Sequence, residues 1–242
     1  MKKKIILGIT ALLLLGAVGG FVYYDYYYAP KRTLTFLPKK APKIAIQPFK
    51  GLDNGSVDEV KKAIERYYGF EVTILPDIPL PEHTKNTHIL KKYHLKLPVR
   101  YRADSLLGYL WDTKPQEYDY VIGLTNQDIS TTKPKKPKWL YTDWGIFGLG
   151  YRPGPTCIVS TYRLYRYANL AQMRTRLRKI AIHELGHNLN LKHCPHKNCV
   201  MQSARETMKT IDTEPESLCD SCKNIIKRKF IVNFPDEQLG KQ

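Results

Sequence analysis

Short apolar runs alternate with amphipathic segments along the first half of the chain. Residues 43–49 (KIAIQPF) and 70–76 (FEVTILP) are short, mainly apolar and bounded by turn-forming residues, which predicts two strands. The segment between them has helical periodicity. Ser56 is expected to cap this helix at its N-terminus with Glu59 as its capping-box partner, and Gly69 is expected to end it.

The same alternation continues through the middle of the chain. Residues 100–112 have a helical pattern and residues 118–129 open as a strand. Residues 77–99, rich in proline and histidine, are expected to form a loop. The order strand–helix–strand–helix–strand predicts an α/β lobe with a mostly parallel sheet. Two further β-like runs lie within residues 146–164, on either side of a Gly/Pro turn.

The strongest helical pattern in the chain runs from Asn169 to Leu189. Five apolar residues recur there at steps of three and four and predict one buried stripe, formed by Leu170, Met173, Leu177, Ala181 and Leu185. The basic residues of the same helix are expected on its solvated face; they are Arg174, Arg176, Arg178 and Lys179.

An apolar run at the N-terminus follows three lysines. Residues 5–24 are long enough to cross a bilayer core of about 30 Å, so residues 1–28 form either a retained membrane anchor or a cleaved signal peptide. Both interpretations place the rest of the chain outside the cytoplasm, anchored by residues 5–24 or released as a secreted or periplasmic protein. A proline-containing linker is expected over residues 29–42, followed by one folded domain over residues 43–242.

Charge and cysteine usage narrow the possible partners. The 39 Lys+Arg and 22 Asp+Glu residues give a formal net charge of +17, which attracts anionic partners without choosing among nucleic acid, lipid and peptide. Apolar residues make up 43% of the chain, enough for a core, which argues against disorder. Four of the five cysteines fall within residues 194–222, and such clustering indicates a metal site before a disulfide framework. Two structural disulfides are the alternative for an exported protein.

The pentapeptide HELGH lies at the end of the long helix. His183 and His187 are one turn apart on one face and can share a metal ion, and Glu184 lies between them. Zinc with three protein ligands and one open position lowers the pKa of its bound water towards about 7. A carboxylate beside the zinc can take a proton from that water and pass it to a leaving amine. The motif therefore predicts zinc-dependent peptide hydrolysis with Glu184 as the general base.

The residues after the helix extend this pattern. His193 follows His187 by six residues, and the next residue begins a C-x4-C pair that a later C-x2-C pair complements. Four thiolates fit a closed tetrahedral zinc site. Neighbouring residues of an extended chain point to opposite sides, so His193 can serve a catalytic zinc while Cys194 serves a structural zinc. Two zinc ions per chain are expected.

The whole string, HELGHNLNLKHCPHKNCVM followed by CDSC, resembles the archaemetzincins. These are metzincin-type zinc peptidases marked by HExxHxxGxxH, an adjoining C-x4-C-x-M and a later C-x2-C. The resemblance implies a Met-turn at Met201 beneath the metal. It also implies a structural zinc site made by four cysteines, namely Cys194, Cys199, Cys219 and Cys222.

The resemblance also implies a fold, a two-lobed zincin of the α/β or α+β class. Its N-terminal lobe has a twisted, mostly parallel sheet with an antiparallel edge strand and two long helices, and its small C-terminal lobe carries the four-cysteine site. IFGLG (146–150) and CIVSTYRL (157–164) are the two candidates for the edge strand or its neighbour. The family's glycine after the helix is Asn190 here, and because Asn tolerates a positive φ the turn is expected to be kept.

These patterns favour a monomeric zinc metalloprotease that acts on a peptide or protein substrate. One alternative is an inactive, metzincin-shaped binding protein, against which the presence of Glu184 argues. Another is a nucleic-acid-binding zinc module, which the expected export disfavours. Basic residues near the catalytic helix predict a preference for acidic substrates through charge steering; they are Arg163, Arg166, Arg174, Arg176 and Arg178.

Overall fold

The computed structural model describes residues 38–94, 98–203 and 207–235. The predicted anchor or signal peptide (1–28) and most of the predicted linker (29–42) lie outside the described residues. No helix in the described part of the chain combines the length and the apolar character that a membrane span requires.

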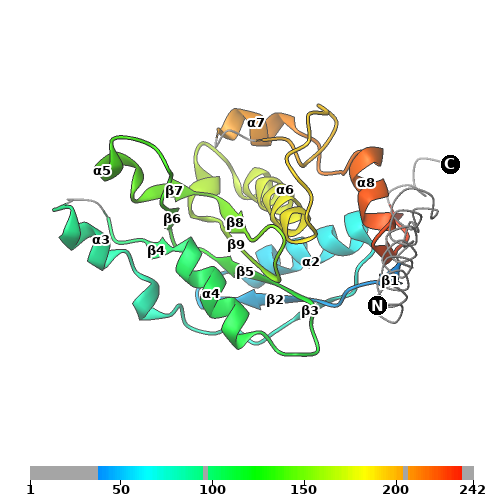
Figure 1. Cartoon of the computed structure of the whole chain (residues 1–242), viewed down its shortest axis with the longest axis horizontal. Helices are drawn as coiled ribbons and strands as arrows, with labels where there is room; N and C mark the ends of the chain where they lie inside the picture. The colour runs from blue at the N-terminus through cyan, green and yellow to red at the C-terminus, as the bar shows by residue number, and fades with distance from the viewer. Residues whose placement is uncertain (1–37, 95–97, 204–206, 236–242) are drawn as a thin grey trace, which may run out of the picture. The chain divides into compact units, whose positions relative to one another are not determined.

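A five-stranded sheet forms the centre of the domain (Figure 1). Its strand order is β3-β2-β5-β9-β8, with β2, β3, β5 and β9 paired in parallel and β8 antiparallel to β9 at one edge. The edge strand therefore comes from the IFGLG run, and CIVS is its neighbour. The bounds of the strands are β2 Ile44–Pro48, β3 Val72–Ile74, β5 Tyr120–Thr125, β8 Gly148–Gly150 and β9 Thr156–Ser160.

Helices pack on both faces of this sheet. Alternate residues of a strand point to opposite faces, so Ile46 and Ile122 pack in one cluster with α2 (Asn54–Tyr68) and α6 (Leu170–Asn188). Their strand neighbours Ala45 and Val121 point to the other face and pack in a second cluster with α4 (Ala103–Thr113). The predicted strand–helix–strand order is present, and both strand faces are buried, as a mostly parallel sheet requires.

The first helix starts earlier than its sequence pattern predicts. Asp53, not Ser56, is the N-cap of α2, because its carboxylate accepts a hydrogen bond from the Ser56 backbone N–H at 2.8 Å. Glu59 makes no capping box and instead forms an ion pair with Arg178 at 2.7 Å. The predicted stop at Gly69 is confirmed, since this residue ends the helix with a φ of +66°.

The long helix α6 has its predicted N-cap but a different distribution of buried residues. Asn169 caps it through a hydrogen bond from the Gln172 N–H at 2.9 Å. Four residues of the predicted stripe are buried, but Leu170, in the exposed first turn, is not. The expected solvated face was wrong for Arg176 and Lys179, which are both buried. Residues 208–216 cover them, and the carboxylate of Asp212 and backbone carbonyls satisfy their charges.

Residues 77–99 are not purely a loop. Their described part contains a 3-10 turn, η1 (Glu82–Thr84), and a short helix, α3 (Thr87–Lys92). Ile89 is the buried residue of α3, and its burial could not be predicted from the local periodicity.

A second, three-stranded sheet leads directly into the edge of the first. It has the order β4-β6-β7, with β4 (Tyr101–Arg102) and β6 (Ile129–Thr131) parallel and β7 (Trp144–Ile146) antiparallel to β6. Only Phe147 separates β7 from β8. The basic stretch between β6 and β7 ends in the single turn of α5 (Lys138–Tyr141).

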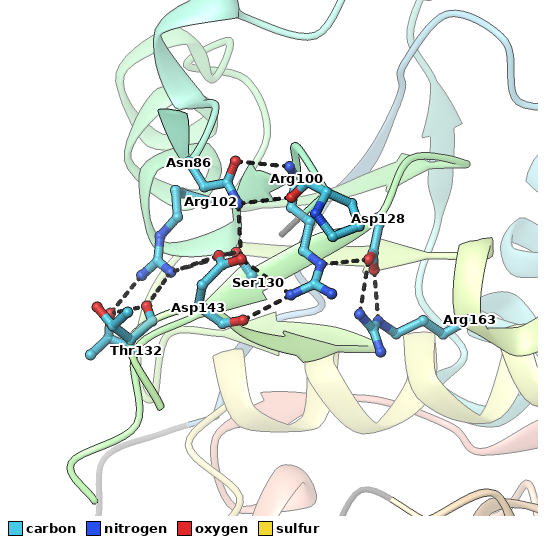
Figure 2. A network of polar contacts seen from close by, with 10 residues as sticks. Asn86, Arg100, Arg102, Asp128, Ser130, Thr132, Asp143 and Arg163 are labelled. Atoms are coloured by element: carbon cyan, nitrogen blue, oxygen red, sulfur yellow. Dashed lines mark hydrogen bonds and ion pairs between the residues drawn. The ribbon is translucent and has the colours of Figure 1, made fainter. Parts of the chain in front are cut away.

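Buried ion pairs tie the three short strands together (Figure 2). The Asp143 carboxylate accepts hydrogen bonds from Arg100 at 3.1 Å, from Asn86 at 2.8 Å and from the Ser130 hydroxyl. Arg102 lies 3.6 Å from the same carboxylate and donates to the Thr142 carbonyl at 2.9 Å. Because every member has a partner, this network fixes the start of β7 and with it the approach to β8.

The chain returns beside its described start. After α7 (Met208–Thr213) and α8 (Asp220–Lys227), strand β10 (Phe230–Ile231) pairs in parallel with β1 (Lys39–Lys40). Segments at the two ends of the described chain therefore lie side by side.

Candidate active site

Three histidines converge at the C-terminal end of α6. His183 and His187 lie one turn apart on the helix, and His193 returns from the segment that follows it. One ring nitrogen from each lies within 4.8 Å of the others. The ring centroids are 4.7 to 5.4 Å apart. This spacing suits three imidazoles that share one metal ion, so the structure brings together all three histidines singled out in the sequence.

Backbone carbonyls set the tautomer of the two helical histidines. Nδ1 of His183 lies 2.8 Å from the Val200 carbonyl, and Nδ1 of His187 lies 2.9 Å from the Leu191 carbonyl. Because a carbonyl can only accept, each Nδ1 must carry the hydrogen, which leaves Nε2 with a lone pair for a metal. Burial, followed by the charge of His187, lowers the pKa of His183 to about 3, so the ring is neutral in the physiological range.

The turn after α6 delivers His193. The Leu191 N–H donates to the Gly186 carbonyl at 2.9 Å and the Asn190 N–H donates to the His187 carbonyl at 2.8 Å, the two bonds of a Schellman motif. Asn190 has a φ of +71°. The prediction that Asn keeps the family's glycine turn is confirmed.

Glu184 lies under the edge strand in this site. A Cβ built on Gly148 would lie 2.9 Å from Cγ of Glu184, and one on Gly150 would lie 3.3 Å from its Oε2. Only glycine lets β8 approach this closely. Burial raises the pKa of Glu184 to about 8 in the metal-free protein, and a bound dication would lower it again.

Met201 packs against the part of α6 that carries the histidines. A Cβ built on Gly186 would lie 2.4 Å from the Met201 sulfur, so the glycine of HELGH makes room for this side chain. Met201 is buried, and its carbonyl accepts a hydrogen bond from the Cys194 N–H at 2.7 Å. These contacts put Met201 next to the glycine of the histidine motif, and its part in a Met-turn stays a prediction.

The four clustered cysteines also converge. Their sulfurs lie within 4.8 Å of one another, and the shortest separations are 3.7 Å, for Cys194–Cys219 and for Cys199–Cys222. A disulfide needs about 2.05 Å, so the thiols are free. The neighbouring Cys222 thiol, 3.7 Å away, and a hydrogen bond from the Cys219 backbone N–H at 3.4 Å lower the pKa of Cys199, which favours a thiolate at this cluster.

A cavity of about 420 Å³ opens at the three histidines. Its lining includes β8, Ile180, Glu184 and Ser203. It also includes Arg152, which belongs to no sequence motif and was not predicted as a site residue. The signal available in the sequence was its position two residues beyond the edge-strand candidate.

The arginines that were expected to attract acidic substrates do not line this cavity. Four of the five are engaged in ion pairs, Arg163 with Asp128 at 2.6 Å among them (Figure 2). The others pair with carboxylates of the domain, namely Arg174 with Asp53, Arg176 with Asp212 and Arg178 with Glu59 and Glu216. Arg166 stacks over the exposed Tyr167 ring. The arginine set predicted to steer substrates was therefore wrong.

A helix with two histidines, a turn that returns a third, and a glutamate beside them define the zincin class of metallopeptidases. The chain belongs to Peptidase family M54, whose model matches residues 43–228. An archaemetzincin of Methanopyrus kandleri is 30% identical over 174 residues, covering 72% of this chain and 87% of the relative. An archaemetzincin of Halobacterium salinarum is 38% identical over 89 residues, an alignment that takes in 34% of this chain and about half (51%) of the relative's length.

Solved structures of archaemetzincins have the same fold. The Methanopyrus kandleri structure matches with a TM-score of 0.60 and 28% identity over 78% of this chain and 94% of its own. The Archaeoglobus fulgidus structure, determined in complex with malonate, matches with a TM-score of 0.59 and 26% identity over 76% and 99%. This is a zinc peptidase fold with mixed α/β sheets and a cysteine cluster, and it places the chain among the zinc metallopeptidases.

Proposed function

We propose that the chain hydrolyses peptide bonds at a zinc ion held by His183, His187 and His193, with Glu184 as general base. One observation carries this proposal: three imidazoles offer their nitrogens within 4.8 Å of one another in the cavity that contains the Glu184 carboxylate. The presence of Glu184 as a base argues against the alternative of an inactive binding protein. The histidine site with this glutamate argues against the alternative of a nucleic-acid-binding zinc module.

Each residue of the site has a part in this chemistry. When bound, zinc in such a site acts as a Lewis acid that makes a water molecule acidic. Glu184 takes the proton of the attacking water and transfers it to the nitrogen of the leaving amine. The free edge of β8 offers backbone groups to an extended peptide, which is held as an added strand. The carbonyls of Val200 and Leu191 keep the histidine rings oriented.

We propose a second, structural zinc at the four cysteines. Free thiols at tetrahedral spacing support it, and so does the lowered pKa of Cys199. His193 and Cys194 are adjacent, so a metal at the cysteines would fix the segment that presents the third histidine. In this arrangement the residues after His193 form the small C-terminal lobe of a two-lobed zincin.

We further propose that the domain acts as a monomer outside the cytoplasm. The monomer is supported by a site to which one chain supplies every residue named here. The location rests on the apolar run 5–24 behind three lysines, which acts either as an anchor or as a signal peptide. N-terminal sequencing of the mature protein distinguishes the two, since a start near Gly20 would identify a cleaved signal.

Two matched variants test the assignment of the metals. The purified protein should contain close to two zinc ions per chain by elemental analysis. His193→Ala should lower the count towards one and abolish cleavage of a peptide library, while the four thiols stay protected from thiol reagents. Cys219→Ser should expose thiols instead. A wild-type protein without zinc, or one that cleaves peptides equally well in the presence of a strong chelator, would refute the proposal.

A further inference from the structure

We propose that Arg152 binds an acidic side chain of the substrate on the N-terminal side of the scissile bond. This inference rests on the proposed peptidase function and names the substrate class of that site. It replaces the general charge steering predicted from the sequence with one residue in the cavity.

Arg152 is the cationic side chain left without a partner where the substrate must lie. It lines the cavity and is exposed, and no residue in the described part of the chain forms an ion pair or hydrogen bond with it. The paired arginines near α6, by contrast, are neutralised by carboxylates of the domain itself. A free guanidinium offers a carboxylate two parallel hydrogen bonds.

None of the described residues that line the cavity is an exposed acid that would neutralise this charge. Among its lining residues in the described ranges Glu184 is the one carboxylic acid, and it is buried beneath Gly148 and Gly150. An incoming carboxylate would therefore find an unopposed positive charge.

The backbone around Arg152 is held in place by the catalytic helix. Asn188, next to His187, donates hydrogen bonds to the Tyr151 carbonyl at 3.0 Å and to the Thr156 carbonyl at 2.8 Å. The Tyr151 ring packs edge-to-face on Trp111, with centroids 5.5 Å apart. Both ends of the turn that carries Arg152 are thereby fixed to the domain, so the backbone that presents this side chain is preorganised.

The direction of β8 determines on which side of the scissile bond the acidic residue of the substrate lies. In an antiparallel pair the two chains run in opposite directions. The earlier residues of an extended peptide that pairs in this way therefore lie opposite the later residues of β8. Gly148 and Gly150 both contact Glu184, so the scissile bond lies opposite this stretch. Arg152 follows β8 by two residues and therefore faces the part of the substrate that precedes the scissile bond.

Matched peptides that differ by Asp or Asn test this assignment. Quenched fluorescent peptides would carry Asp or Asn at each of three positions before the scissile bond, with amidated C-termini. At low salt the zinc-loaded wild type should cleave the best Asp peptide roughly tenfold faster in kcat/KM than its Asn partner, as expected for one charge-assisted pair. Arg152→Gln should bring the ratio of Asp to Asn cleavage near one, whatever its effect on the rate for the Asn peptide. Arg152→Lys should retain part of the preference for the Asp peptide. Arg166→Gln, which removes another exposed arginine, should retain all of it.

Binding without turnover separates this inference from the proposed function. In the Glu184→Gln background, calorimetry should show tighter binding of the Asp peptide than of the Asn peptide, and Arg152→Gln should abolish the difference. Cleavage by wild type with no difference between Asp and Asn peptides would overturn the role of Arg152. So would a preference that survives Arg152→Gln or that requires a free C-terminal carboxylate. A binding difference without any cleavage would uphold Arg152 and refute the peptidase.

Discussion

The contact between two glycines and one carboxylate decides the geometry of the site at the scale of single residues. Gly148 brings β8 against the Glu184 side chain, where any larger residue would occupy its place. A general base works only within hydrogen-bond reach of the proton that it takes, so a shift of about 1 Å matters.

Gly148→Ala should therefore lower kcat by roughly tenfold or more with little loss of zinc, because the added Cβ would lie 2.9 Å from both Glu184 and Ile180. Steady-state kinetics with zinc analysis would measure this. Gly108→Ala is the matched control, since a Cβ there meets nothing within 4 Å and alanine favours a helix. Equal kinetics in the two variants would contradict the positioning role of Gly148.

Glu214 is a second buried acid, and it makes stability depend on pH. It is 4% exposed, and neither carboxylate oxygen has a hydrogen-bond partner in the described structure. Burial raises its pKa from 4.5 to about 8, with Lys179 opposing the rise and Cys199 adding to it. A raised pKa means that the folded state prefers the protonated acid. The stability that Glu214 contributes is thus complete below about pH 4.5 and is lost as the pH rises towards about 8.

Glu214→Gln mimics the protonated acid and should raise Tm relative to wild type by an amount that grows from pH 6 to pH 9. Thermal unfolding of both zinc-loaded proteins would measure this difference. Glu216→Gln removes a partner of Arg178 and should lower Tm across the same range. A Tm difference for Glu214→Gln that does not change with pH would show that the acid is ionised throughout.

Some residues of the site could be predicted from the sequence and others could not. The convergence of His183, His187 and His193 and the positive φ of Asn190 were predictable, because helical spacing and the backbone tolerance of Asn determine them. Arg152 was not, because its importance comes from lacking a partner, a property that only the folded surroundings define. Arg176 was predicted wrongly, because its position in the helical pattern is that of a surface residue. In the structure it is buried and pairs with Asp212, 36 residues away.

The small sheet β4-β6-β7 is the element that supports the catalytic edge strand. Its stability depends on Asp143, whose side chain is fully buried between Arg100 and Arg102 (Figure 2). Removing one partner of a buried pair leaves an uncompensated charge, which costs about 3–5 kcal/mol.

Asp143→Ala should accordingly lower the free energy of unfolding by about 3–5 kcal/mol in denaturant titrations. Asp104→Ala provides the control, because it removes a 56% exposed carboxylate 3.1 Å from the same Arg102 and should cost about 1 kcal/mol or less. Similar costs for the two variants would show that the network does not stabilise the sheet.

Elements were predictable where local pattern and tertiary packing agree. The strands of the main sheet and the helix from Asn169 follow from their periodicity. The helix α3 was missed because six residues give too little periodicity, and its order depends on burying Ile89. The start of α2 was misplaced by three residues because two good caps, Asp53 and Ser56, compete, and the structure uses the first.

At the scale of the whole domain, one short segment connects the two proposed metal sites. His193 and Cys194 are consecutive, and the Cys194 N–H bonds to the carbonyl of Met201, which packs under the catalytic helix. Sequence spacing predicted that the two ligand clusters adjoin, and their coupling through bound metals stays a prediction. It did not identify the edge strand, because both candidate runs are short and apolar and only their pairing separates them.

The most direct test of the central claim compares the wild type with Glu184→Gln at equal zinc content. Glu184 is a base and not a ligand in this account, so the variant should stay folded and retain close to two zinc ions. It should nevertheless lose peptide cleavage by about two to four orders of magnitude, the contribution of a positioned general base. Loss of zinc from the variant, or cleavage at the wild-type rate with zinc retained, would contradict the role assigned to Glu184.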